Sequence, residues 1–495
     1  MSSTIFSPSL KPKRLWAARA WLESGWAERV LFTIGEDGHW ANIVVDTDQP
    51  IDATIVNGAA LPGMVNAHSH AFQRAFAGMA ERRGSERQNS SLSISTDANT
   101  DANTNKNKNT NASTNDNFWS WRDRMYSVAL RITPDQLEAI AAQLFIELLR
   151  GGYTQVCEFH YLQHDPHGTP YDDPLRLSWA VADAADTAGI GLTMLPVLYE
   201  RAGFSQPKLR DDQRRFASTP ASVWAAREAL HHCGRPLLNA GVAIHSLRAA
   251  SPQSIAVLRD LTTDNTPIHI HVSEQIQEVE DCVATLGARP IAWLAQEKLL
   301  DSRWQLVHAT HTVESEIASI TSSGAGFVVC PSTEANLGDG FCDLPNWLAS
   351  RVAMSIGSDS HISRDWREEL RLLEYGQRLQ KQQRNISSSI ATPSTAERLW
   401  QRSQIGGAVA AGFKQWGLAV GARADLLVVN SDDAHLLGIP DLQRMDALVF
   451  SSPSSPWRDV MVAGQWVVRD HHHANAAAAA ERFADAMRAL WKAEQ

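Results

Sequence analysis

The chain has 495 residues, of which 44% are hydrophobic and 20% are charged, as in an ordinary globular protein with room for more than one domain. Its formal net charge of -10 argues against a general nucleic-acid binder, which would present a basic face. The five cysteines are an odd number and form no Cys-x-x-Cys motif. That pattern is typical of reduced thiols in the cytoplasm and not of a disulfide framework.

No targeting or membrane segment is expected. The opening residues, MSSTIFSPSLKPKRLWAARAW, contain no continuous apolar stretch of the kind that a signal peptide needs. No other segment approaches the roughly 20 apolar residues of a membrane-spanning helix. We therefore expect a cytoplasmic protein that binds neither membranes nor nucleic acid.

Residues 14–55 contain short strand-like segments, RLWAARAWL, RVLFTIG and WANIVVD, separated by turn signals. The segment LPGMVNAHSHAFQ follows at residues 61–73. His68 and His70 stand one residue apart at the end of a predicted strand, so both imidazoles point to the same side. Such a pair is half of a metal site if the rest of the chain supplies other ligands.

Residues 85–117 are dominated by Asn, Ser, Thr and Asp, and we predict a disordered surface insertion there. Thr133 then opens a well-marked helix. Thr133 and Gln136 have the spacing of a capping box, Pro134 suits the first turn, and Gly151 and Gly152 end the apolar periodicity.

Strands and helices alternate from that helix onwards. Together with the strands before HSH and FHY, the strand candidates are GIGLTMLPVLY, NAGVAIHS, TPIHIHVSE, WQLVHAT, GAGFVVCPS and RVAMSIGSDS. Eight such βα units predict an α/β fold, a TIM (β/α)8 barrel over residues 61–415.

The period changes again near the C-terminus. The segments GLAVGARADLLVVNSDDA and DALVFSSPSSPWRDVMVAGQWVVRD read as strands with turns. We predict that residues 1–60 and 416–475 form one small β-sandwich domain, discontinuous in sequence, and that the Ala-rich residues 476–495 form a terminal helix. The run from His471 to His473 lies in this domain, away from the barrel mouth, and is not predicted to bind metal.

Six of the predicted barrel strands end in polar functional groups, where the active site of a TIM barrel lies. These groups include Glu158, His160 and Tyr161, then His245 with Arg248, His308 with His311, and Asp359 with His361. Imidazoles and one carboxylate hold zinc or iron and leave one position for water. His68, His70 and Asp359 supply three such ligands. The fourth is His269 or His271, since both point to the same side of their strand and spacing does not choose between them.

The motifs PGMVNAHSHAFQ, IHIHVSE, LVHAT and GSDSH together resemble the amidohydrolase superfamily. Within it, HSHAFQRAFAG, FWSWR, EFHYLQHDPHG, IHSLRA, CPSTEANLGDGF and GSDSHISRDWREELRLLEYGQRL are similar to the N-formimino-L-glutamate deiminase family. The resemblance covers most of the chain. It implies hydrolysis of N-formimino-L-glutamate to N-formyl-L-glutamate and ammonia, a step of histidine degradation, by a homodimeric enzyme.

The resemblance also implies roles for single residues. The metal ligands are His68, His70, His271 and Asp359. Glu274 matches the proton-shuttling acid and base, His308 the histidine that polarises or orients the attacked group, and Asp359 also takes a proton from metal-bound water. The residues matching substrate-contacting positions are Gln73, Arg122, Tyr161, His245 and Arg248. No lysine follows the fourth strand, so a single divalent metal is implied, zinc in the first place and iron as the alternative.

The chemistry of the residues agrees with this resemblance. Metal lowers the pKa of bound water toward ~7, and the resulting hydroxide can attack the formimino carbon. Guanidinium groups such as those of Arg248 and Arg122 bind carboxylates bidentately, which suits a substrate with two of them. Two alternatives stay open: a related enzyme that deaminates a heterocycle such as guanine, and a non-catalytic barrel used for binding.

Overall fold

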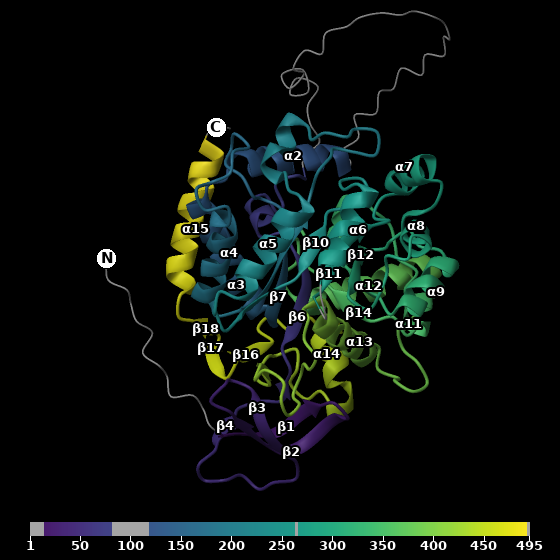
Figure 1. Cartoon of the computed structure of the whole chain (residues 1–495). Helices are drawn as coiled ribbons and strands as arrows, with labels where there is room; N and C mark the ends of the chain where they lie inside the picture. The colour runs from purple at the N-terminus through teal and green to yellow at the C-terminus, as the bar shows by residue number, and fades with distance from the viewer. Residues whose placement is uncertain (1–13, 82–117, 263–265, 493–495) are drawn as a thin grey trace, which may run out of the picture.

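Eight parallel strands form a barrel at the centre of the molecule (Figure 1). The computed structural model describes residues 14–81, 118–262 and 266–492. The barrel strands are β6 (Met64–Ser69), β7 (Tyr153–His160), β8 (Gly191–Leu198), β10 (Val242–Ile244), β11 (Ile268–Val272), β12 (Trp304–His308), β13 (Gly326–Val329) and β14 (Met354–Ile356). A short strand, β9 (Leu238–Ala240), precedes β10 and pairs with β8. The predicted α/β class and TIM barrel are confirmed.

The barrel closes between its first and last strands. Ser69 and Asp359 form a parallel bridge, in which the Asp359 amide donates to the His68 carbonyl at 3.0 Å and the His70 amide donates to the Asp359 carbonyl at 3.2 Å. Strands β7 and β8 are buried along their whole length, as expected for parallel strands covered on both faces. Their near-continuous apolar sequences follow from this double burial.

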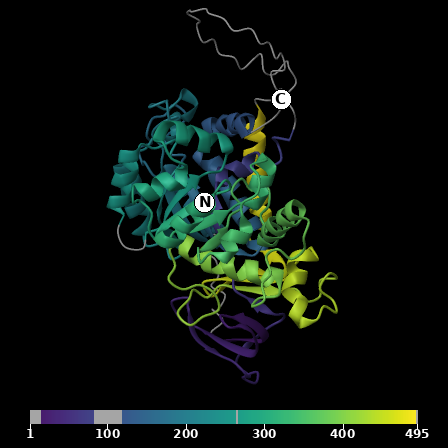
Figure 2. The same cartoon turned by 90° about the vertical axis from the view of Figure 1, so that its right-hand side faces the viewer.

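Helices surround the barrel and extend beyond it (Figures 1 and 2). The α-helices are α2 (Phe118–Arg131), α3 (Pro134–Arg150), α4 (Arg176–Ala188), α5 (Pro220–His231), α6 (Pro252–Leu261), α7 (Ile276–Leu286), α8 (Pro290–Gln296), α9 (Glu314–Ser323), α10 (Pro331–Leu337), α11 (Leu344–Ala349), α12 (Trp366–Lys381), α13 (Thr395–Ala410), α14 (Arg444–Phe450) and α15 (Ala476–Trp491). The part of the chain that the structure describes also contains the 3-10 turns η1 (Ala71–Ala75), η2 (Asp211–Phe216) and η3 (Asp441–Gln443).

The predicted capping box at the start of α3 is present. The Gln136 amide donates to the Thr133 hydroxyl oxygen at 3.3 Å, and the Thr133 amide donates to the Gln136 side chain at 3.0 Å. The two exchanged bonds satisfy amides that would otherwise lack partners in the first turn.

A second sheet joins the two ends of the chain. Its members are β1 (Arg14–Leu22), β2 (Gly25–Ile34), β3 (Trp40–Val44), β4 (Thr54–Val56), β5 (Ala60–Leu61), β15 (Leu426–Val429), β16 (Trp457–Val462), β17 (Gln465–Arg469) and β18 (His472–His473). Strand β5 pairs with β1 and with β15, and so links the N-terminal and C-terminal strands. This sheet lies below the barrel in Figures 1 and 2, at the end opposite α2. The exact domain limits stay a prediction.

One predicted strand is a helix. Residues 446–450, DALVF, belong to α14, which buries Met445, Leu448 and Val449 at helical spacing. The Asp446 carboxylate accepts a hydrogen bond from the Ala396 amide at the start of α13, at 2.9 Å. A short apolar segment does not reveal its period, and this distant contact decides its conformation.

Other predictions meet the structure in part. Helix α15 occupies residues 476–491 of the predicted terminal helix, whereas the predicted disordered insertion at residues 85–117 lies outside the described residues. The five cysteines are free thiols, and Cys233 is the exposed one. Within the described ranges, no helix combines the length and apolar character needed to cross a membrane.

The packing of α13 against the barrel gives a test of the fold. A Cβ atom on Gly406 would lie 2.0 Å from the Met354 carbonyl oxygen of β14. Alanine favours a helix over glycine by about 1 kcal/mol, but overpacking costs about 1–3 kcal/mol, and more against rigid backbone. We expect Gly406→Ala to lower the free energy of unfolding, measured by urea denaturation. Gly203→Ala, where a Cβ atom would have no neighbour within 4 Å, should leave it unchanged.

Candidate active site

The residues predicted from the strand ends converge on one pocket beneath α2. The pocket encloses about 570 Å³ of empty space, including its mouth open to solvent. Ten of the eleven predicted site residues line it: His70, Gln73, Arg122, Tyr161, His245, Arg248, His271, Glu274, His308 and Asp359. The eleventh, His68, lies beneath the floor and is fully buried. The structure therefore brings all of the predicted residues into one region.

Three imidazoles and a carboxylate meet at the floor of the pocket. The Nε2 atom of His68 lies 3.1 Å from Nε2 of His70 and 2.9 Å from Nε2 of His271. The Oδ1 atom of Asp359 lies 3.5 Å from His68 Nε2 and 3.3 Å from His70 Nε2. His68 on β6, His70 directly after it, His271 on β11 and the aspartate after β14 thus direct their ligand atoms at one another.

The hydrogen bonds of the outer ring nitrogens indicate what this cluster requires. His70 Nδ1 faces the Phe159 carbonyl at 3.0 Å, and His271 Nδ1 faces the His245 carbonyl at 2.9 Å. A carbonyl only accepts, so each Nδ1 carries the proton and a neutral ring has its lone pair at Nε2. Burial lowers the pKa of His68, His70 and His271, which keeps the rings neutral. Converging lone pairs beside a carboxylate fit a divalent cation.

His269 is separated from this cluster. Its Nε2 atom lies 2.9 Å from the Ala410 carbonyl at the end of α13. Burial lowers the pKa of His269 to about 4. The structure therefore resolves the ambiguity in the sequence in favour of His271 as the ring at the candidate metal position.

The histidines near the C-terminus have structural contacts. His473 Nε2 lies 2.8 Å from the Ala188 carbonyl, and His471 Nδ1 lies 3.0 Å from the Trp457 carbonyl. These bonds connect the end of the second sheet to the barrel helix α4 and to β16.

Two ionisable groups stand above the candidate metal position. His308 Nε2 lies 3.8 Å from Glu274 Oε1 and 3.7 Å from Asp359 Oδ2. Burial raises the pKa of Glu274 to about 7, so this carboxyl group exchanges a proton near neutral pH. Burial works to lower the pKa of His308, but Glu274, Glu334 and Asp359 raise it to about 10.

The backbone at these positions is strained. His308, Ala309 and Asp359 have φ angles of 68°, 46° and 46°, a region that side-chain-bearing residues rarely adopt. Such conformations persist where the surrounding structure imposes them, and they are concentrated at functional sites. Here they turn His308 and Asp359 inward at the point where β12 and β14 end.

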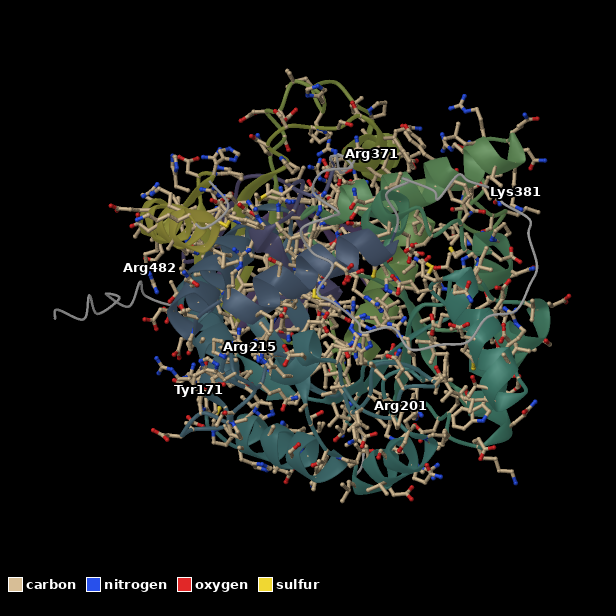
Figure 3. All side chains as sticks on the ribbon, turned by 90° about the horizontal axis from the view of Figure 1, so that it is seen from above. Tyr171, Arg201, Arg215, Arg371, Lys381 and Arg482 are labelled. Atoms are coloured by element: carbon tan, nitrogen blue, oxygen red, sulfur yellow. The ribbon has the colours of Figure 1, made fainter. Side chains whose placement is uncertain are left out.

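Polar side chains for substrate binding line the walls of the pocket. Gln73 Nε2 donates to the Tyr161 hydroxyl group at 3.1 Å, and the Tyr161 ring lies edge-on to His245 with centroids 5.8 Å apart. Arg201, labelled in Figure 3, donates to the Leu247 carbonyl at 2.8 Å and to the Arg248 carbonyl at 3.2 Å. These bonds fix the loop after β10 that carries Arg248.

Helix α2 brings Arg122 to the pocket. The buried Arg215 guanidinium group donates to the Ala129 carbonyl and, at 2.9 Å, to the Ile132 carbonyl, both at the end of α2. Arg215 lies beside Tyr171 in the view from above (Figure 3). Gln213, on the same turn as Arg215, donates to the Tyr126 hydroxyl group at 3.0 Å. The helix is thereby anchored to the barrel.

The sequence did not single out every residue of the pocket. The additional lining residues are Trp121, Met125, Tyr126, Ser246, Glu278 and Leu337. Tyr126 lies one helical turn after Arg122 on α2. Glu278 lies in the first turn of α7 and accepts a hydrogen bond from the Glu274 amide, which precedes the helix, at 3.0 Å. The i,i+4 spacing was the available signal for Tyr126, but it becomes informative only once α2 is known to be helical.

Residues 59–467 match the model of the amidohydrolase family. The chain belongs to this family. It is 43% identical over 473 residues to a formimidoylglutamate deiminase from Pseudomonas aeruginosa, covering 95% of this chain and 97% of that relative. It is 25% identical over 411 residues to a 5-methylthioadenosine/S-adenosylhomocysteine deaminase from Natronomonas pharaonis, covering 83% and 81% of the two chains.

Solved structures agree with this membership. An amidohydrolase from Brucella melitensis superposes with a TM-score of 0.85 at 36% identity, over 96% of this chain and 99% of the other. An adenosine deaminase from Xanthomonas campestris with bound zinc superposes with a TM-score of 0.72 at 20% identity, over 96% and 98% of the two chains. The second likeness shows the shared fold alone.

Close packing behind His68 gives a test of the candidate metal position. A Cβ atom on Gly357 would lie 2.6 Å from the His68 Cβ atom and 3.0 Å from its backbone nitrogen and oxygen. We expect Gly357→Ala to displace His68 and to weaken metal binding by about 10-fold or more, as other changes behind metal ligands do. Competition with a chelator of known affinity measures this change. Unaltered affinity would contradict the placement of His68, and Gly203→Ala serves as the control.

Proposed function

We propose that this amidohydrolase hydrolyses N-formimino-L-glutamate to N-formyl-L-glutamate and ammonia. One observation carries the proposal. The pocket has a cluster of three imidazoles and a carboxylate, suited to a metal ion, at its floor and two arginines, Arg122 and Arg248, on its wall. The relative from Pseudomonas aeruginosa, a formimidoylglutamate deiminase, supports the same activity.

The residues proposed to hold the metal are His68, His70, His271 and Asp359. Three neutral nitrogen donors and one carboxylate favour zinc, although the same donors bind iron. Two similar solved structures, an adenosine deaminase with bound zinc and an atrazine chlorohydrolase complexed with zinc, support this choice. When bound, the metal supplies Lewis acidity and makes water nucleophilic at neutral pH.

Glu274 is proposed to move the proton that the reaction requires. When water replaces the amidine nitrogen, that nitrogen must be protonated so that it departs as ammonia. Because burial raises the pKa of Glu274 to about 7, this group can accept a proton from water and donate it to nitrogen. His308, 3.8 Å from Glu274, is proposed to orient the attacked group, and Asp359 to accept a proton from the attacking water.

Arg248 and Arg122 are proposed to bind the two carboxylates of the glutamate portion. Burial lowers the pKa of Arg122, and Arg248 acts in the same direction, which places the two guanidinium groups within electrostatic reach of each other. A dianion between them relieves their repulsion. Gln73, Tyr161 and His245 are proposed to complete the substrate contacts.

A deaminase acting on a heterocycle is the second candidate. The names of relatives at 23–26% identity, 5-methylthioadenosine/S-adenosylhomocysteine deaminases, favour it. Guanidinium groups bind carboxylates bidentately and have no such pairing with a neutral ring, so the two partly buried arginines favour the acyclic dicarboxylate. The homodimer, the cytoplasmic location and the place in histidine degradation stay predictions.

Comparison of substrates tests the proposed function. We expect the purified protein to release ammonia from N-formimino-L-glutamate. With guanine or 5-methylthioadenosine as substrate, we expect no release of ammonia above background. Removal of metal with a chelator should abolish turnover, and zinc should restore it. Turnover of a heterocycle without turnover of N-formimino-L-glutamate would refute the proposal.

Substitution of Glu274 tests the proposed proton transfer. Glu274→Gln keeps the size and polarity of the side chain but not the exchangeable proton, so we expect kcat to fall by about 10²–10⁴-fold, the usual contribution of general acid–base catalysis. Glu200→Gln is the matched control, because Glu200 bonds Ser251 and Ser254 outside the pocket and should leave kcat unchanged. Full activity of Glu274→Gln would contradict the assigned role.

A further inference from the structure

We propose that Glu334 is a positioning residue that fixes the proton on Nδ1 of His308 and aims its Nε2 atom at the reacting group. This inference rests on the proposed function, because it concerns the same pocket. Glu334 does not line that pocket, so it would act through His308 and not on substrate.

The contact lies behind the pocket wall. Glu334 Oε1 is 3.3 Å from His308 Nδ1 and accepts a second hydrogen bond from the Cys330 amide at 2.9 Å. His308 is 1% exposed and Glu334 is 4% exposed, so water does not compete for either group. The Cys330 amide holds the carboxylate in place, and the carboxylate in turn holds the imidazole.

This arrangement determines the direction of the imidazole. An ionised carboxylate accepts hydrogen bonds only, so His308 Nδ1 must carry a proton to bond Glu334. The opposite nitrogen, Nε2, then faces Glu274 and Asp359. A partner on one ring nitrogen keeps a proton on that nitrogen and sets the orientation of the ring, as for metal-bound and general-base histidines. The positive φ of His308 adds to the need for such a restraint.

The same three side chains could instead form a second cation site, since ligand atoms of His308, Cys330 and Glu334 lie within 4.8 Å of one another. Cys330 argues against this alternative. Burial raises the pKa of its thiol, and a protonated thiol is a poor ligand. The hydrogen bond from the Cys330 amide also occupies the carboxylate oxygen that faces His308.

The chain offers a matched control in Glu369. This carboxylate is fully buried and accepts hydrogen bonds from the Ser332 amide at 2.9 Å and from the Ser332 hydroxyl group at 2.7 Å. Glu334 and Glu369 therefore both bond groups at the start of α10, but only Glu334 is described in contact with His308. A merely structural role predicts equal effects for the two glutamine variants.

The first experiment compares Glu334→Gln with Glu369→Gln, both loaded with metal. We expect Glu334→Gln to lower kcat for N-formimino-L-glutamate by at least tenfold, with KM changed less than threefold, and Glu369→Gln to change neither by more than threefold. Equal losses in the two variants would overturn the inference, as would a loss confined to KM. A second equivalent of bound metal in the wild type that disappears in Glu334→Gln would also overturn it.

The second experiment repeats the substitution in a His308→Ala background. If Glu334 acts through His308, Glu334→Gln should cause no further loss of kcat once the imidazole is absent. A further tenfold loss would overturn the inference. The proposed function fails separately, when the wild type releases no ammonia from N-formimino-L-glutamate. In that event the same variants, assayed with the substrate that the wild type does convert, still test the role of Glu334.

Discussion

The site depends on the closure of the barrel between β6 and β14. The two hydrogen bonds that join these strands involve the backbone of His68, His70 and Asp359, whose side chains form the candidate metal cluster. The closure of the barrel and the candidate metal cluster therefore involve the same three residues. Residues almost 300 positions apart in sequence are held at ligand distance by the main chain, and Gly357 permits the approach because it has no Cβ atom. Any movement of the first strand against the last would open the barrel and the cluster together.

Burial determines the pKa values of the acidic groups in and near the pocket. Glu274, Glu278 and Asp339 have raised pKa values, in each case chiefly because burial disfavours their charge. The cations His308 and Arg248 offset part of the free-energy cost of burying these carboxylates. The carboxylates around His308 in turn raise its pKa. An isolated buried charge would be expensive, whereas alternating acids and bases compensate one another. The pocket thus holds one carboxyl group, Glu274, that exchanges a proton near neutral pH, among charged neighbours held by the protein.

Sequence patterns predicted most of this arrangement, because barrel strands carry local signals. His68 and His70 reveal their common direction through strand alternation alone, and all eight barrel strands were recognised. Strand spacing left the choice between His269 and His271 open, and the family resemblance implied His271. The structure supplies the physical reason, since His269 faces the Ala410 carbonyl, 141 residues away in sequence. Glu334 stood in a recognised motif without a role because its partner, His308, lies 26 positions earlier. Long-range contacts of this kind leave no periodicity in the sequence.

The candidate catalytic residues and the candidate substrate-binding arginines come from different parts of the fold. The candidate ligands and Glu274 project from barrel strands or from residues directly after them, whereas Arg122 comes from α2 and Arg248 from the loop after β10. Helix α2 is attached through Arg215 and Gln213 of η2. Solved structures with a similar fold include an adenosine deaminase and a triazine hydrolase. The fold by itself therefore does not determine the substrate. In this chain α2 and the loop after β10 contribute Arg122 and Arg248, and their positive charge suits the dicarboxylate that we propose as substrate.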